Sequence, residues 1–186
     1  MRLAPWMAAA IAAAALPTAS VQAKTPSDAF VVASNLSQMI TLDPAAINES
    51  FTAGLMRNVC DALIGIDPDD PTKLVPGLAE SWKVAPDAST YTLTIRQGLK
   101  FPSGNPVTAE DIAWSMKRNL QLNLANAQRL REWDITKENV DAVVQALDAR
   151  TLQIKPTRPW APGLFLYAFT DFRVAPALDR REILKN

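Results

Sequence analysis

The stretch 78–118 constrains the fold more than any other part of the chain. Between residues 90 and 96, Tyr91, Leu93 and Ile95 alternate with polar residues, which is the period of a strand with one buried face. Before this run, Trp82 and Val84 also lie two apart, and residues 86–89 carry the proline, aspartate and serine that favour turns. We therefore predict a β-hairpin here.

The same stretch continues into a turn and a helix. Residues 101–104 read Phe-Pro-Ser-Gly, which fits a type I turn because proline presets φ and glycine is favoured at the last position. Thr108 is predicted as the helix N-cap, with its hydroxyl accepting a hydrogen bond from the amide of Asp111, while Glu110 and Asp111 place negative charge at the positive end of the helix dipole. Three residues at helical spacing predict a buried stripe: Ile112, Met116 and Leu120. Strand and helix in one segment favour an α/β fold with a mixed sheet.

The part of the chain before this stretch predicts one strand and one helix. Residues 30–33 form a short apolar run that is consistent with a buried strand. Residues 50–63 are predicted as an amphipathic helix, with Ser50 as the cap and Gly65 as the stop. Its apolar stripe recurs every four residues: Phe51, Leu55, Val59 and Leu63. Residues 67–71 are acidic and rich in proline, but they lack the spacing of a calcium loop, so we expect a solvated turn.

After the stretch, a second hairpin is predicted. It combines Val140, Val143 and Val144 with the alternating Leu152 and Ile154. Trp133 lies among charged residues of alternating sign, and we expect it to cover the core because aromatic side chains bury a large area. Further helices are predicted at 164–169 and from 180 to 185.

The first 23 residues are typical of an export signal. Arg2 gives a short positive region, residues 3–16 are apolar and rich in alanine, and residues 21–23 form a small-x-small cleavage site. A membrane-spanning helix needs about 20 apolar residues, and this run is shorter and contains Pro5. We predict cleavage between Ala23 and Lys24 and release into the periplasm of a Gram-negative bacterium.

The composition argues against several classes of function. Cleavage would remove one of 19 basic residues and none of 19 acidic ones, so the formal charge of −1 does not suggest a nucleic-acid partner. The chain has no histidine, the commonest metal ligand and the usual general base near neutral pH, so we expect no metal or other cofactor. Cys60 is the one cysteine and is predicted to be a small buried apolar residue on a helix face. An exported enzyme stays as an alternative, but Glu110 and Asp111 point about 100° apart on a helix and do not converge.

The order of motifs resembles the family 5 solute-binding proteins of ABC transporters, which bind peptides, oligopeptides or nickel. Pro-Gly-Leu-Ala-Glu-Ser-Trp at 76–82 is followed by Gly-Leu-Lys-Phe at 98–101 and Ser-Gly-Asn-Pro-Val-Thr-Ala-Glu-Asp at 103–111. A second block comprises Val-x-Ala-x-Asp-x-x-Thr-Leu at 144–152 and Pro-Trp-Ala-Pro at 159–162. Two departures stand out. Pro102 lies where members often have histidine, and residues 60–63 read Cys-Asp-Ala-Leu where members often have aromatic-Glu-x-Leu.

The resemblance implies both a fold and a function. Residues 24–186 would be the N-terminal, incomplete part of a family 5 domain, within lobe I of a two-lobed periplasmic binding protein of type II. Such a protein would act as a monomer that captures a peptide or related small solute and delivers it to an ABC permease at the inner membrane, without catalysing a reaction. A truncated remnant that binds nothing is the other reading of the chain.

The resemblance also suggests ligand contacts. In the family, the loop after the first strand borders the ligand cleft, which makes Asn35, Ser37, Gln38 and Met39 the predicted ligand-binding residues. The alternative for each of these side chains is that it only solvates a surface loop.

Overall fold

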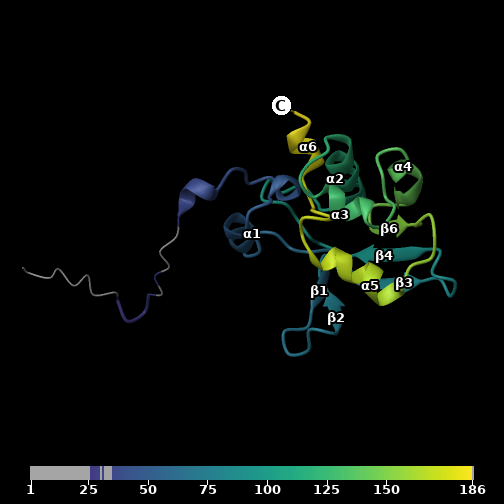
Figure 1. Ribbon diagram of the computed structural model, residues 1–186, viewed down its shortest axis with the longest axis horizontal. Coiled ribbons are helices and arrows are strands. Elements are labelled where there is room, and N and C mark those ends of the chain that lie inside the picture. The colour runs from purple at the N-terminus through teal and green to yellow at the C-terminus, as the bar shows by residue number, and fades with distance from the viewer. Residues whose placement is uncertain (1–25, 30, 32–34, 186) are drawn as a thin grey trace, which may run out of the picture. The chain divides into compact units, whose positions relative to one another are not determined.

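A computed structural model describes residues 26–29, 31 and 35–185 of the chain. These fall into two units, one ending at Asn35 and the other beginning at Leu36. In the first unit the amide of Ala29 donates to the carbonyl of Pro26, which closes a turn. The predicted strand at 30–33 and the predicted signal at 1–23 lie outside the described residues, apart from Val31. The helices and strands that the structure describes lie in the second unit (Figure 1).

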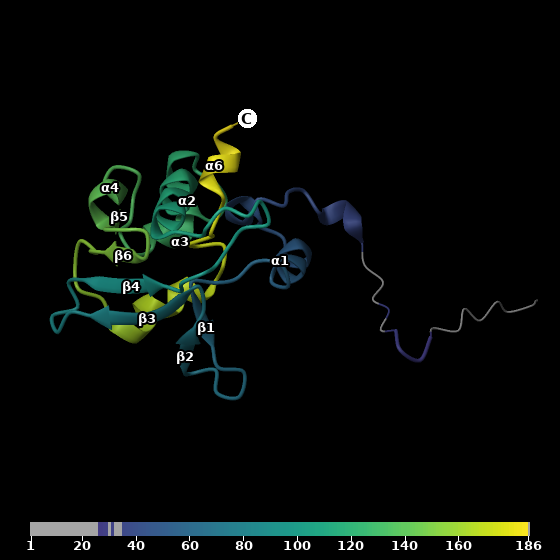
Figure 2. The ribbon, with the colours of Figure 1, turned by 180° about the vertical axis from the view of Figure 1, so that it is seen from behind.

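A four-stranded antiparallel sheet forms the centre of the second unit. Its strands are β3 (Ala79–Val84), β4 (Tyr91–Ile95), β5 (Val144–Ala146) and β6 (Thr151–Ile154), in the order β3-β4-β6-β5. Trp82 pairs with Leu93 and Val144 pairs with Ile154, so the first predicted hairpin is confirmed and the second is confirmed from Val144 onward. Leu93 also pairs with Leu152, so the two hairpins lie side by side. A separate hairpin joins β1 (Ile64–Ile66) to β2 (Leu74–Pro76), and Figure 2 shows it projecting from the sheet.

The helices are short except for one. They are α1 (Ser50–Met56), α2 (Ala109–Gln121), α3 (Ala127–Arg131), α4 (Val140–Val143), α5 (Pro162–Tyr167) and α6 (Arg180–Ile183), with 3₁₀ turns η1 (Leu36–Gln38), η2 (Pro44–Ala46) and η3 (Ala168–Thr170). The long helix α2 packs against β5 and β6, and its predicted stripe of Ile112, Met116 and Leu120 is buried. From α5, Phe165 lies 4.5 Å from the ring of Tyr91 on β4.

The start of α2 has the predicted cap. The hydroxyl of Thr108 accepts from the amide of Asp111 at 3.3 Å, and the carboxylate of Asp111 accepts from the amide of Thr108 at 3.0 Å. This reciprocal pair satisfies two amides that the helix itself cannot bond. Trp133 is half-buried and packs edge-on against Trp160 and Phe165, as expected for a residue that covers the core.

The predicted helix at 50–63 is wrong in its length and in its buried face. Helix α1 ends at Met56, with Glu49 at the cap position, and Thr52, Ala53 and Met56 face inward. Val59, from the predicted stripe, is 73% exposed. The helix cannot continue because the carbonyls of Ala62 and Leu63 accept from the amides of Leu78 and Ala79, which holds that segment extended, and Gly65 therefore lies in β1.

A second correction concerns residues 140–143. They were predicted as part of a strand, but they form the helical turn α4, and the strand begins only at Val144. The side chain of Asn139 accepts from the amide of Thr136 at 2.8 Å and starts this turn. Valines at positions 140, 143 and 144 fit helical spacing as well as a strand, so the pattern alone could not separate the two.

Candidate functional site

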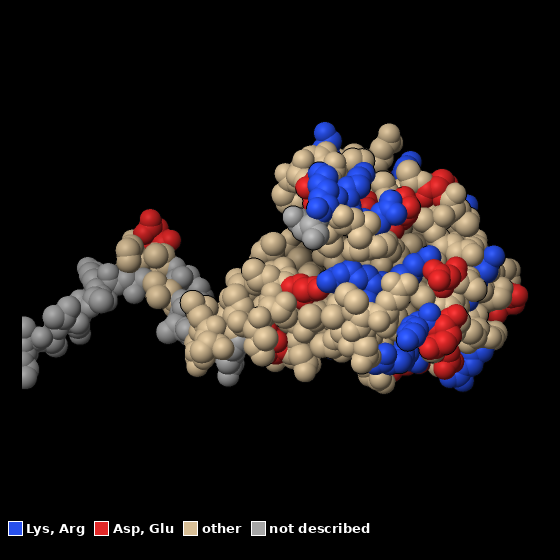
Figure 3. Space-filling view, turned by 90° about the horizontal axis from the view of Figure 1, so that it is seen from above, with Lys and Arg blue, Asp and Glu red and all other residues tan. Residues whose placement is uncertain are grey.

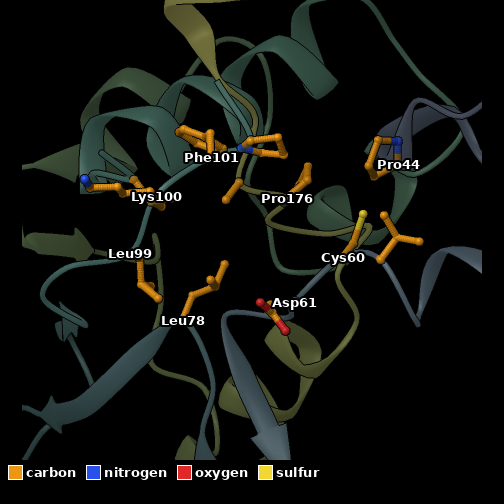
Figure 4. Close-up of a pocket in the computed structure, with 12 residues that line it drawn as sticks. Pro44, Cys60, Asp61, Leu78, Leu99, Lys100, Phe101 and Pro176 are labelled. Atoms are coloured by element: carbon orange, nitrogen blue, oxygen red, sulfur yellow. The ribbon is translucent and has the colours of Figure 1, made fainter. Parts of the chain in front are cut away.

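A hollow of about 260 Å³ lies between five segments of the chain (Figure 4). We call it the Cys60 hollow. It is lined by Pro44, Val59, Cys60, Asp61, Leu78, Leu99, Lys100, Phe101, Pro102, Val107, Pro176 and Ala177. Pro44 and Cys60 lie on one side of the hollow, and Leu99 and Lys100 lie across the space from them. The walls are mainly apolar, so the hollow suits an apolar group of a small ligand.

The turn after β4 shapes one of these walls. The amide of Gly104 donates to the carbonyl of Phe101 at 2.9 Å, as the predicted turn requires, and Gly104 has a φ of 88° that favours glycine. The amide of Phe101 in turn donates to the carbonyl of Asn105. These bonds fold the chain back on itself and hold Phe101 and Pro102 at the rim.

Cys60 and Asp61 supply the polar groups on the opposite side. Burial and the nearby charge of Asp61 raise the pKa of the Cys60 thiol, so the thiol stays protonated and is a weak nucleophile at neutral pH. Cys60 is only half-buried and follows α1, which corrects the prediction of a buried residue on a helix face. Asp61 makes no ion pair or hydrogen bond with the described residues and can accept one from a ligand.

A second and more polar hollow of about 720 Å³ adjoins the first at these two residues. We call it the Arg57 hollow. Its lining comprises Arg57, Cys60, Asp61, Ala62, Ile64, Gly65, Ile66, Arg129, Tyr167, Ala168, Thr170, Asp171 and Phe172. All three residues of β1 line it, and among the described strands β1 pairs only with β2.

The charges in the Arg57 hollow are only partly balanced. Asp171 is held by Arg173, whose Nη2 lies 2.7 Å from a carboxylate oxygen, and by the more distant Arg129 at 3.6 Å. Burial of Asp171 opposes ionisation, but the hydrogen bonds from Arg173 outweigh it and lower the pKa of this carboxyl. Arg57 has no such partner among the described residues and is exposed. On the face that Figure 3 shows, acidic and basic side chains are interspersed.

Comparison with known proteins shows the family of the chain. The family model for "Bacterial extracellular solute-binding proteins, family 5 Middle" matches residues 73–183, which is more than half of the chain. The chain belongs to family 5 of the bacterial extracellular solute-binding proteins. The match begins just before β2 and ends with α6, and it includes most residues that line the Cys60 hollow, although Cys60 itself precedes it.

Curated relatives and solved structures agree with this family. The chain is 31% identical over 141 residues to the glutathione-binding protein GsiB of Shigella boydii and 32% identical over 157 residues to that of Salmonella typhi, covering 76% and 83% of this chain. The structure of the periplasmic murein tripeptide-binding protein MppA in its unliganded open form matches with a TM-score of 0.68 at 25% identity over 78% of this chain. A periplasmic oligopeptide-binding protein of Borrelia burgdorferi also matches with a TM-score of 0.68, at 26% identity over the same share.

The chain is much shorter than these proteins. It spans 25% and 29% of the two curated relatives and 29% and 30% of the two solved chains. The α/β fold expected from the sequence is that of part of the family 5 proteins. Within the described residues, no helix is both long and apolar enough to cross a membrane.

The structure does not place the four predicted ligand-binding residues of this family 5 protein among the described residues that line either hollow. Asn35 lies in the first unit, whereas Ser37 and Gln38 belong to η1 in the second, and Met39 follows them with its amide bonded to the carbonyl of Leu36. Asn35, Ser37 and Met39 are not among the residues that line the hollows. Their role in binding stays a prediction.

Sequence reasoning missed Cys60 and Asp61 as hollow-lining residues of this family 5 protein. One signal could have pointed to them. Residues 60–63 depart from the aromatic-Glu-x-Leu pattern, and a small cysteine in place of an aromatic ring leaves space beside it. No group of three or more acidic, cysteine or histidine side chains in the described part of the chain could hold a metal ion.

Proposed function

We propose that the protein is the exported solute-binding component of an ABC importer, which captures a peptide or related small solute in the periplasm and delivers it to a permease. It would act as a monomer and catalyse no reaction. The observation that carries this proposal is the pair of hollows that meet at Cys60 and Asp61, in a chain of a solute-binding family. The curated relatives are glutathione-binding proteins, which makes a tripeptide-like solute our first choice.

The lining of the hollows supports a peptide-like solute. Such a molecule has an amino group, a carboxylate and main-chain amides. The unpaired carboxylate of Asp61 suits the first, and the guanidinium of Arg57 suits the second because arginine binds carboxylates through two parallel hydrogen bonds. β1 lines the Arg57 hollow and pairs only with β2 among the described strands, so it would offer main-chain groups to an extended ligand, which is a common way of holding peptides without regard to their side chains.

The loop predicted to follow the first strand, with Asn35, Ser37, Gln38 and Met39, would add further contacts to the solute. Residues 24–186 would supply the N-terminal part of lobe I, and the rest of the protein would close on the solute by a hinge motion, as two-lobed binding proteins do.

Uptake by cells tests the proposed function. The gene is disrupted, and the cells are given radiolabelled glutathione, a tripeptide and a free amino acid as a control. We expect uptake of glutathione or the tripeptide to fall and a plasmid copy of the gene to restore it, with amino-acid uptake unchanged. A copy carrying Arg57→Ala should be exported normally but restore less uptake. Unchanged uptake of every peptide-like solute in the disrupted strain would contradict the proposal.

A further inference from the structure

We propose that Asp179 clasps the two walls of the Cys60 hollow together and so controls how far its mouth opens. One wall is the turn that carries Phe101 and Pro102, and the other is the segment that carries Pro176 and Ala177. This inference rests on the proposed function in one respect: it assumes that the Cys60 hollow is part of the solute-binding surface. Asp179 would be a positioning residue that touches no solute.

We call the hydrogen bonds of Asp179 to the opposite wall the clasp, and they lie close to the hollow in sequence. One carboxylate oxygen of Asp179 accepts from the hydroxyl of Ser103 at 2.5 Å and from the side-chain amide of Asn105 at 2.8 Å. Ser103 directly follows Pro102, and Asp179 comes two residues after Ala177. The Ser103 hydroxyl also accepts from the amide of Asn105 at 3.2 Å, so the same group organises the turn and binds the carboxylate.

The segment before Asp179 is held by packing and by side chains rather than by backbone hydrogen bonds: Pro176 is buried and Ala177 packs against the core. From residue 175 to residue 178, no backbone group is hydrogen-bonded to the backbone of another described residue. Val174 and Ala175 are anchored in the core, but Ala177 is only half-buried. Loss of the Asp179 bonds should therefore loosen the link between the walls, while Arg181 still bonds the carbonyl of Pro106 and Asn105 still bonds Glu182.

The charges around Asp179 keep the clasp ionised. Partial burial disfavours the charged carboxylate, but the hydrogen bonds from Ser103 and Asn105 outweigh it and lower the pKa of Asp179 to about 2. Arg181 lies 3.5 Å from Asp179 and 3.2 Å from the buried Asp111, and it also donates to the carbonyl of Pro106. The other charged groups near this end of α2 and α6 pair with each other: Arg180 with Glu110, and Lys185 with Glu182.

The single cysteine of the chain allows the clasp to be tested without any solute. Cys60 lines the hollow, so the rate at which N-ethylmaleimide modifies it reports access. We expect Asp179→Ala, which removes both hydrogen bonds, to raise this rate at least about tenfold, the change that the loss of one charge-assisted hydrogen bond produces in an opening equilibrium. Ser103→Ala, which removes the same bond from the other wall and is a milder change, should raise the rate in the same direction.

The matched control is Asp134→Ala. Asp134 accepts from Arg158 at 2.7 Å and lies away from the hollow lining, so its loss should leave the Cys60 rate unchanged. Amide hydrogen exchange gives a second readout: in Asp179→Ala the amides of Gly104 and Ile183 should exchange faster, while that of Ile95 in β4 should not. Circular dichroism confirms that each variant is folded. An unchanged Cys60 rate in both Asp179→Ala and Ser103→Ala would overturn the clasp, and this outcome would leave the uptake experiment unaffected.

Discussion

At the scale of single residues, Asp61 is the acidic group that the two hollows share. It lines the Cys60 hollow and the Arg57 hollow, and its charge is the second cause, after burial, of the raised pKa of the neighbouring thiol. The pKa of Cys60 therefore reports the charge at the meeting point of the hollows. A cation bound beside Asp61 would lower that pKa in the same way as removal of the carboxylate.

Asp61→Asn should lower the pKa of Cys60 without bringing it fully to its ordinary value, because the contribution of burial remains. The thiolate is the reactive form, so the rate of alkylation at a fixed pH should rise and the rate–pH profile should move to lower pH. The measurement is the alkylation rate across the alkaline range. Asp67→Asn in the β1–β2 turn is the control, since Asp67 pairs with Lys73 and is absent from the lining. A profile that does not move in Asp61→Asn would contradict this electrostatic assignment.

Among the described glycines, Gly77 is the one at which a side chain would meet the closest backbone atom. A Cβ atom there would lie 2.5 Å from the carbonyl oxygen of Ala62 and 3.0 Å from that of Leu63. Because both atoms belong to the backbone that holds residues 62–63 extended, Gly77→Ala should lower the free energy of unfolding by about 2 kcal/mol. Gly54→Ala in α1 is the control: a Cβ there meets nothing within 4 Å, and the helix should gain about 0.5–1 kcal/mol. Urea denaturation of both variants measures this, and equal stabilities would refute the close-packing argument.

At the scale of elements, α2 depends on its first turn. Thr108→Ala removes the cap and should cost about 1 kcal/mol. Asp111→Ala removes the other half of the reciprocal pair and a buried partner of Arg181, so it should cost more, about 2 kcal/mol. Glu110→Ala is the control, because Glu110 is largely exposed in its pair with Arg180 and should cost well under 1 kcal/mol. Urea denaturation should give this order of unfolding free energies, and a cost for Glu110→Ala equal to that of Asp111→Ala would contradict it.

Some elements could be predicted from the sequence alone and others could not. Strand β4 and helix α2 were predictable because alternation and a cap motif are local signals. Helix α1 was predicted too long because backbone hydrogen bonds from residues 78 and 79 hold residues 62 and 63 extended. A local sequence pattern does not identify such distant hydrogen-bond partners. The Cys60 hollow was not predictable either, since Pro44, Cys60, Phe101 and Pro176 converge only in the folded chain.

At the scale of the whole molecule, the first question is export. Residues 1–23 are predicted to be removed, and the exported protein should begin at Lys24. N-terminal sequencing of protein from the periplasmic fraction measures this. The control is the same chain with Ala23→Lys, which disrupts the small-residue cleavage site and should leave the precursor uncut. Periplasmic protein that still begins with Met1 would refute the cleavage prediction.

The length of the chain determines the affinity for solute that we expect. The chain spans about a quarter to three tenths of the relatives it matches, so any ligand contacts made by the remainder of such a protein are missing. Binding by this chain should be weak, with a Kd of about 1 mM. Ligand at a concentration equal to Kd stabilises a protein by only about 0.4 kcal/mol, so peptides should not clearly raise the thermal midpoint.

Amide chemical shifts detect such weak binding directly and test the central claim that this chain contributes a solute-binding surface. We predict that glutathione or a tripeptide, titrated into the ¹⁵N-labelled chain, shifts the amides of residues that line the two hollows, such as Arg57, Asp61 and Leu99. The same titration of the Asp61→Asn variant should give smaller shifts. The absence of shifts at these residues up to saturating peptide, or shifts confined to other parts of the chain, would contradict the account.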